Sequence, residues 1–67
     1  MNLRVNGIMR EFDETSMTVT ELLKILKYSF PNIIVRYKEY TVPKIQFDDT
    51  ILYDKDEISI IHNMSGG

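Results

Sequence analysis

The sequence predicts an α+β domain in which one helix covers one face of a mixed sheet of four to five strands. Three observations support this prediction. Two apolar–polar alternating runs flank an Asn6-Gly7 pair, a helix-capping pattern precedes an apolar stripe, and β-prone runs follow at 33–37 and 57–61. Because one helix and one sheet can bury each other's apolar faces, this order of elements favours a two-layer domain.

The length and composition indicate a single domain over residues 1–67. The chain has no cysteine, and 43% of its residues are hydrophobic, so one well-patterned core must hold the fold without disulfides. The formal net charge is −2, and no basic cluster suggests a nucleic-acid partner. Neither a membrane-spanning run nor a signal peptide is visible. We therefore expect a cytoplasmic protein with no membrane or nucleic-acid partner.

The first element is a β-hairpin over residues 1–12. Apolar and polar residues alternate over 1–5, the period of a half-buried strand. Asn6-Gly7 is the dipeptide best suited to a type I′ turn, whose two central residues need positive φ. Residues 8–12 form the returning strand, with Phe12 directed to the core.

A helix follows the turn-rich residues 13–16. Thr18 and Glu21 have the spacing of a capping box, and Met17 and Leu22 that of a hydrophobic staple. The helix is expected to end before Pro31, since the residue that precedes a proline disfavours helical geometry. The apolar stripe, most simply explained as core, consists of Val19, Leu22, Leu23 and Leu26. The basic residues of the C-terminal half, which suit the helix dipole, are Lys24 and Lys27.

The second half of the chain supplies the remaining strands. Residues 33–37 form a strand, residues 38–39 a turn or bulge, and residues 40–42 a short edge strand before Pro43. We expect residues 44–52 to be irregular, residues 54–56 to form a turn, and residues 57–61 to form the last strand. The inward residues of the two longer strands are Ile33, Val35, Tyr37, Ile58 and Ile60. The residues expected to close the base of the core are Ile45, Phe47, Ile51 and Leu52.

The first and last strands are expected to be parallel neighbours in the middle of the sheet. This arrangement is the β-grasp fold, and it would send an extended tail, residues 62–67, past the edge of the sheet. The sequence ends Gly66-Gly67. Two residues without side chains can enter a slot that excludes any Cβ, and a carboxylate becomes an electrophile once it is adenylated. A Gly-Gly end is weak evidence by itself, because chain ends are commonly disordered.

The whole chain resembles the ThiS family, the sulfur carriers of the thiamine pathway within the ThiS/MoaD ubiquitin-like β-grasp superfamily. In chain order, the residues that carry the resemblance are Val5-Asn6-Gly7, Arg10-Glu11-Phe12, Thr18-Val19, Leu22-Leu23, Val42-Pro43-Lys44, Phe47, Leu52, Asp54-Lys55-Asp56-Glu57-Ile58 and Gly66-Gly67. The chain departs from the family at Lys38-Glu39, where members often have Asn-Gly, and Asn63-Met64-Ser65 is no distinctive match.

The resemblance implies that this protein is a substrate of other enzymes and not a catalyst. A ThiF/MoeB-like activating enzyme would use ATP to adenylate the Gly67 carboxylate, and a cysteine desulfurase system would supply the sulfur of a C-terminal thiocarboxylate. Thiazole synthase or another acceptor would then receive that sulfur. Gly66, Ser65 and Met64 would be recognised as the tail, and no cofactor is expected to be bound.

One apolar patch is a candidate surface for such partners. Ile34 and Arg36 on the third long strand and Ile61 on the last share the sheet face opposite the helix, and apolar spots on solvated faces can mark interfaces. Single exposed aliphatic residues are also ordinary. The lone His62 is more simply a solvated strand end than a ligand, and the acidic residues of 48–57 lack the spacing of a calcium loop, so no metal site is predicted.

Three alternatives to the thiamine sulfur carrier stay open. A small subunit of molybdopterin synthase would use the same chemistry but would need a large permanent partner. A ubiquitin-like modifier would join Gly67 to lysines of other proteins. A β-grasp interaction module with an inert tail would tolerate a residue added after Gly67.

Overall fold

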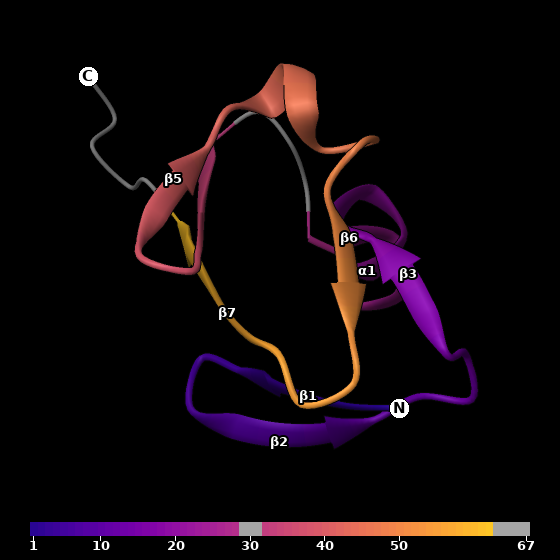
Figure 1. Ribbon diagram of the computed structural model, residues 1–67. Coiled ribbons are helices and arrows are strands. Elements are labelled where there is room, and N and C mark those ends of the chain that lie inside the picture. Colours follow the sequence, from indigo (N-terminus) through magenta and orange to yellow (C-terminus); the bar gives the residue numbers. More distant parts are fainter. Residues whose placement is uncertain (29–31, 63–67) are drawn as a thin grey trace.

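The computed structural model describes residues 1–28 and 32–62. Five strands form one mixed sheet in the order β2-β1-β7-β4-β5 (Figure 1). Their bounds are Asn2–Val5 for β1, Ile8–Glu11 for β2, Ile33–Tyr37 for β4, Tyr40–Val42 for β5 and Glu57–His62 for β7. The predicted fold class is confirmed, with one helix packed on one mixed sheet.

The predicted N-terminal hairpin is confirmed. Strands β1 and β2 pair antiparallel, and Val5 lies opposite Ile8 across the turn. Asn6 and Gly7 have φ values of 52° and 82°, as a type I′ turn requires. Phe12, expected in the core, is partly buried against it.

The two ends of the sequence meet in the centre of the sheet, as predicted. Strands β1 and β7 run parallel, with Val5 beside Ile58. Strand β4 pairs antiparallel with the other edge of β7, from Ile33 opposite His62 to Tyr37 opposite Ile58. The last strand therefore has a neighbour on each side, and it extends one residue beyond the predicted end at Ile61.

The helix α1 spans Val19–Ile25 and begins at the predicted capping box. The Glu21 amide donates to Thr18 Oγ1 at 3.1 Å, and the Thr18 amide donates to Glu21 Oε1 at 2.8 Å. Met17 and Leu22, at the two positions of the predicted staple, are both buried. These local contacts fix the start of the helix and turn its apolar stripe toward the sheet.

The helix ends earlier than Pro31 suggested. Ile25 is its last residue, and Lys27 has a φ of 62°. The Tyr28 amide donates to Leu23 O at 3.0 Å, and the Lys27 amide donates to Lys24 O at 3.1 Å. This pair of bonds is a Schellman motif. Lys27 therefore lies beyond the helix, and the prediction that it belongs to the C-terminal half was wrong.

A second, two-stranded sheet was not predicted. Strand β3, Ser16–Thr18, pairs antiparallel with β6, Ile51–Tyr53, and the two lie side by side in Figure 1. A short 3₁₀ helix, Lys44–Gln46, follows β5. Ser16 and much of the segment 44–52 are therefore in regular structure, which the sequence did not indicate. Each of these strands has three residues, too few to show an alternating pattern.

The core lies between α1 and the five-stranded sheet, and the small sheet helps to close it. Its buried residues are Leu3, Val5, Met17, Val19, Leu22, Leu23, Ile33, Val35, Tyr37, Val42, Phe47, Leu52, Ile58 and Ile60. Phe47 and Leu52 fill the base of the core as expected. Ile45 is 86% exposed and Ile51 is also exposed, so their predicted core role was wrong. In β6, Leu52 takes the inward position, and strand alternation turns Ile51 outward.

The Tyr37 side chain links the end of β4 to the turn before β7 by a hydrogen bond. Its hydroxyl donates to Asp56 Oδ2 at 2.5 Å, and the Tyr53 amide donates to the same oxygen at 2.9 Å. Burial, assisted by the Asp56 carboxylate, raises the pKa of the Tyr37 hydroxyl. The hydroxyl therefore remains a donor through neutral pH. Its contribution to stability is lost only as the pH rises above the ordinary tyrosine pKa toward this raised value.

The two residues of the turn between β4 and β5 have left-handed backbone conformations, which are strained because neither residue is a glycine. Lys38 and Glu39 have φ values of 51° and 68°. We expect Glu39→Gly to raise the free energy of unfolding by roughly 0.5 to 1 kcal/mol, because the left-handed penalty of a residue with a Cβ exceeds the added entropy of an unfolded glycine. Urea denaturation measures the change.

Gly7→Ala is the matched control for this variant. An added Cβ at Gly7 would meet no atom within 4 Å, and the φ of 82° is retained, so the measured loss is the backbone strain less the entropy that the unfolded chain loses with its glycine. We expect a loss of about 1 kcal/mol. Unchanged stability of the Glu39→Gly variant would contradict this account of the turn.

Candidate functional site

The predicted patch lies on the outer face of the sheet, away from the helix. Ile34 and Ile61 are opposite each other on β4 and β7 and are 37% and 45% exposed. Their neighbours Ile33 and Ile60 point into the core. Arg36, also exposed, lies opposite Ser59 on the next outward-facing pair. The structure thus brings Ile34, Arg36 and Ile61 together on one solvated surface, which we call the outer-face patch.

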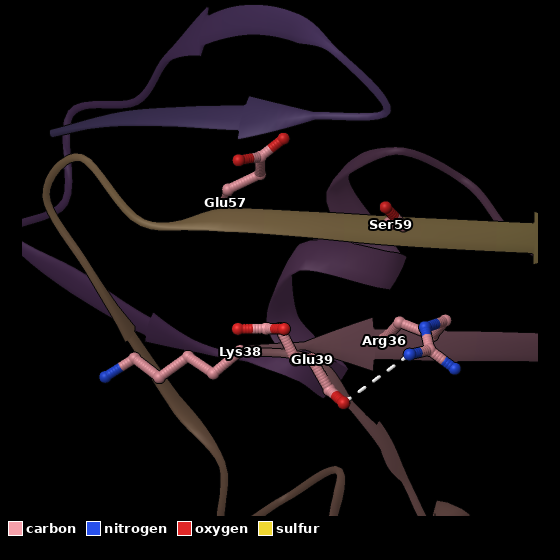
Figure 2. A pocket seen from close by; sticks show the side chains of 5 residues that line it. All are labelled: Arg36, Lys38, Glu39, Glu57 and Ser59. Carbon is pink, nitrogen blue, oxygen red and sulfur yellow. Dashed lines mark hydrogen bonds between the residues drawn. The ribbon is translucent and has the colours of Figure 1, made fainter.

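Arg36 borders a shallow hollow lined by side chains of β4, β7 and the turn between β4 and β5 (Figure 2). Its guanidinium donates to the main-chain oxygen of Glu39 and to Thr41 Oγ1, both at 3.5 Å. Both acceptors are neutral, and both distances are at the outer limit of a hydrogen bond. The Arg36 guanidinium is therefore held by two weak contacts to neutral oxygens, and the Glu39 and Glu57 side chains line the same hollow.

His62 is the last described residue of β7, and residues 63–67 follow it in the sequence. It lies opposite Ile33 in the sheet, and its ring packs edge-on against the Tyr28 ring with centroids 5.5 Å apart. The predicted tail residues Met64, Ser65, Gly66 and Gly67 lie outside the described residues. His62 is exposed, as expected of a strand end, and its aromatic contact with Tyr28 was not predicted.

Asn6 connects the N-terminal hairpin to β7 close to that end. Its Nδ2 donates to Ile60 O at 3.1 Å, and its Oδ1 accepts from the Ile60 amide at 2.7 Å. The side chain thus continues the parallel ladder after β1 has turned away, and we call this pair of bonds the Asn6 clasp. Nδ2 also lies 3.4 Å from the Tyr28 hydroxyl. Asn6, Tyr28 and His62 therefore link the hairpin, the helix end and the last strand.

Sequence reasoning assigned Asn6 only to its turn. An Asn-Gly pair is fully explained by the positive φ values of a type I′ turn, so nothing local indicates a second role. The partners of the Asn6 side chain are the main-chain amide and carbonyl of Ile60, which is far away in the sequence. Main-chain groups are the same in every residue type, so the identity of residue 60 does not indicate the contact. Only the parallel pairing of the first and last strands suggests that the first turn lies beside the last strand.

Within residues 1–28 and 32–62, no group of three or more histidine, cysteine, aspartate or glutamate side chains is arranged to hold a metal ion. Among the same residues, no helix is long and apolar enough to cross a membrane.

The sheet order, the single helix and the central last strand define the class of this protein as a ubiquitin-like β-grasp domain. The chain belongs to the ThiS family, whose model matches residues 3–67. A significant sequence match was not found among curated proteins.

Two solved structures of a Geobacter metallireducens protein are similar to this chain. One is a crystal structure of thiamine biosynthesis protein ThiS, with a TM-score of 0.88, 35% identity and full coverage of both chains. The other is a solution structure of a thiamine biosynthesis protein, with a TM-score of 0.81 and 35% identity, which covers all of this chain and 88% of the other.

The Asn6 clasp gives a testable prediction. In Asn6→Gly the backbone keeps its freedom to adopt a φ of 52°, but Ile60 loses both side-chain partners. We expect the free energy of unfolding to fall by about 2 kcal/mol, because a partly buried amide and carbonyl lose their hydrogen bonds. Urea denaturation measures the loss, and hydrogen exchange of the Ile60 amide shows whether β7 opens locally.

Asn6→Asp separates the two bonds of the clasp. Aspartate keeps an acceptor for the Ile60 amide but has no donor for Ile60 O, so its stability should lie between those of the wild type and Asn6→Gly. An Asn6→Gly variant as stable as the wild type, with an equally protected Ile60 amide, would show that the clasp contributes nothing.

Proposed function

We propose that this protein is a sulfur carrier of thiamine biosynthesis whose Gly67 carboxylate is adenylated and then converted to a thiocarboxylate. The observation that carries the proposal is the ThiS-family match, which extends through residue 67 of a chain that ends Gly66-Gly67. The structural likeness to thiamine biosynthesis protein ThiS over the full chain supports it.

The proposed chemistry uses the C-terminal carboxylate alone and no side chain as a catalyst. A carboxylate oxygen of Gly67 bonds to the α-phosphorus of ATP, and pyrophosphate leaves. The outer sulfur of a persulfide on the sulfur donor then attacks the carbonyl carbon of the acyl-adenylate, and AMP leaves with the original oxygen. A thiol of the donor system reduces the resulting acyl disulfide, which releases the thiocarboxylate and leaves a disulfide on the donor. When the acceptor takes the sulfur, an oxygen from the acceptor or from water replaces it and the carboxylate is restored. The protein is thus a cosubstrate in our proposal, and the catalytic groups belong to its partners.

The pairing of the last strand with its neighbours holds its end in a fixed position, which suits this role. β7 pairs with β1 at Glu57 and Ile58 and with β4 from Ile58 to His62. Asn6 also bonds to Ile60, and the Tyr28 ring packs against His62. A partner that binds the folded domain would therefore find the start of the tail at a fixed position. Met64, Ser65 and Gly66 would be the residues recognised between this fixed point and the reacting carboxylate. Because Gly66 and Gly67 have no side chains, they would fit into a narrow active-site channel of the partner.

We propose that the outer-face patch is the surface by which a ThiF/MoeB-like activating enzyme recognises the domain. Ile61 on β7, the strand that leads to the tail, and Ile34 opposite it on β4 offer exposed aliphatic area, and Arg36 adds a charge beside them. The sulfur source would be a cysteine desulfurase system, and the acceptor thiazole synthase. Because the activation step requires ATP, this proposal places the protein in the cytoplasm.

The state of Gly67 is the first test of the proposal. The intact mass of protein purified from its native host without reductant should include a fraction heavier by the mass difference between sulfur and oxygen. A variant without Gly67 should lack this fraction, because its terminal carboxylate lies one residue closer to the folded domain and Ser65 replaces a glycine at the penultimate position. Peptides of other proteins that carry a Gly-Gly remnant on lysine would instead indicate a modifier, and a stable hetero-oligomer in the same purification would favour a molybdopterin synthase subunit.

The outer-face patch is tested by ATP–pyrophosphate exchange with the activating enzyme. Ile61→Asp and Arg36→Glu should each raise the KM for the carrier by about tenfold, because central interface residues carry most of the binding energy. Ile45→Asp is the matched control, since Ile45 is an exposed isoleucine of the 3₁₀ helix. An equal effect of Ile45→Asp and Ile61→Asp would contradict the assignment.

A further inference from the structure

A groove separates the free edge of β2 from the C-terminal end of α1. Its volume is about 430 Å³, with Ile8 and Arg10 on the β2 side and Ile25, Leu26, Lys27 and Tyr28 on the helix side. It is distinct from the outer-face patch, because Ile8 and Arg10 lie opposite the core residues Val5 and Leu3 and so share the helix side of the sheet.

The lining of the groove combines apolar surface with positive charge. Ile8 and Ile25 are 60% and 46% exposed, although aliphatic side chains on this side of the sheet are mostly buried. Arg10 and Lys27 add two positive charges, and none of the described residues that line the groove is acidic. This local balance contrasts with the formal net charge of −2 of the whole chain. The groove is therefore complementary to a ligand that carries both aliphatic and acidic groups.

The wall formed by β2 also offers main-chain hydrogen bonds. Among the strands of residues 1–28 and 32–62, β2 is the outermost of the sheet, with β1 as its one neighbour. In an antiparallel pair, alternate residues direct their main-chain groups toward the neighbouring strand. The Phe12 amide donates to Met1 O at 2.8 Å, so residues 8, 10 and 12 face β1. The amide and carbonyl groups of Met9 and Glu11 consequently point outward, where another strand can pair with them.

We propose that this groove binds an extended segment of a partner protein, which pairs with β2 as an additional strand and alternates outward residues with aliphatic and acidic groove-facing residues. The aliphatic side chains pack between Ile8 and Ile25, and a carboxylate pairs with Arg10 and Lys27. Main-chain pairing supplies affinity and the alternate side chains supply specificity. This inference does not depend on the chemistry of Gly67.

The position of the groove gives the proposed contact a functional consequence. Tyr28 lines the groove and contacts His62 at the end of β7. A segment bound along β2 therefore anchors a partner close to the start of the tail and leaves the outer-face patch free. Two partners could in this way contact the same carrier on different sides of the sheet.

The test titrates ¹⁵N-labelled full-length protein with the peptide acetyl-Thr-Ile-Thr-Glu-Thr-Ile-Thr-amide, whose isoleucine and glutamate side chains share one face when extended. The Met9 and Glu11 amides should shift and exchange more slowly with solvent, and Ile8 and Ile25 should shift with them. Arg10→Glu should weaken binding about tenfold, since it replaces an attractive charge pair by a repulsive one. The same peptide with lysine in place of glutamate should bind Arg10→Glu better than the wild type.

Lys44→Glu is the matched control, because it makes the same charge change next to β5, the opposite edge strand of the sheet. Binding of the glutamate peptide to this variant should equal that of the wild type, and the spectra of both variants establish that they are folded. Absence of shifts at Met9 and Glu11 at millimolar peptide overturns the proposal. Shifts confined to β5, or equal weakening by Arg10→Glu and Lys44→Glu, overturn it as well.

Discussion

The parallel pairing of β1 with β7 is the constraint on which the rest of this structure depends. It is the one parallel pair among the described strands, and it places the first and last strands of the sequence in the middle of the sheet. Because parallel strands need a long crossover connection, the chain has to leave the sheet after β2, on one side of this pair, and rejoin it at β4, on the other side. The helix, the edge hairpin and the small β3–β6 sheet all lie within the connection from β1 to β7.

The same pairing determines how the end of the chain is presented. A terminal strand at the edge of a sheet frays easily, whereas β7 has hydrogen-bonded neighbours on both sides. The Asn6 clasp extends this support to Ile60 after β1 has ended. A short reactive segment attached to such a strand starts from a fixed point, and this lowers the entropic cost for an enzyme that must place it.

The outer-face patch and the groove beside β2 differ in chemistry. The outer-face patch combines Ile34 and Ile61 with a single cation, and it lies on the strands next to the start of the tail. The groove beside β2 combines aliphatic surface with two cations and an open strand edge. A carrier that passes between enzymes has to be recognised more than once, and the two surfaces that we propose would let one partner bind before another leaves.

Local rules predicted the elements whose stabilising contacts are close in sequence. The Asn6-Gly7 hairpin and the Thr18–Glu21 capping box follow from interactions within a few residues, and both were predicted correctly. The β-grasp arrangement was also predicted, because one helix and a few amphipathic strands leave few ways to bury their faces.

Features that depend on distant or unusual partners were missed. Strands β3 and β6 have three residues each, and their pairing is visible only in the folded chain. The helix end at Ile25 depends on the left-handed conformation of Lys27, where glycine would be the expected signal. Ile45 and Ile51 were assigned to the core because hydrophobicity alone cannot distinguish neighbouring isoleucines from Phe47 and Leu52. The candidate patch was placed correctly on a shared face because strand alternation is a local rule.

The most direct test of the central claim is adenylation of the carrier by its activating enzyme, measured as ATP–pyrophosphate exchange with the wild-type chain and with a variant that carries one alanine after Gly67. The account predicts exchange with the wild type and none with the extended variant, because the reacting carboxylate is moved and a Cβ is placed in a channel that fits glycine. Equal exchange with both proteins would contradict the claim that the domain serves to present the Gly67 carboxylate.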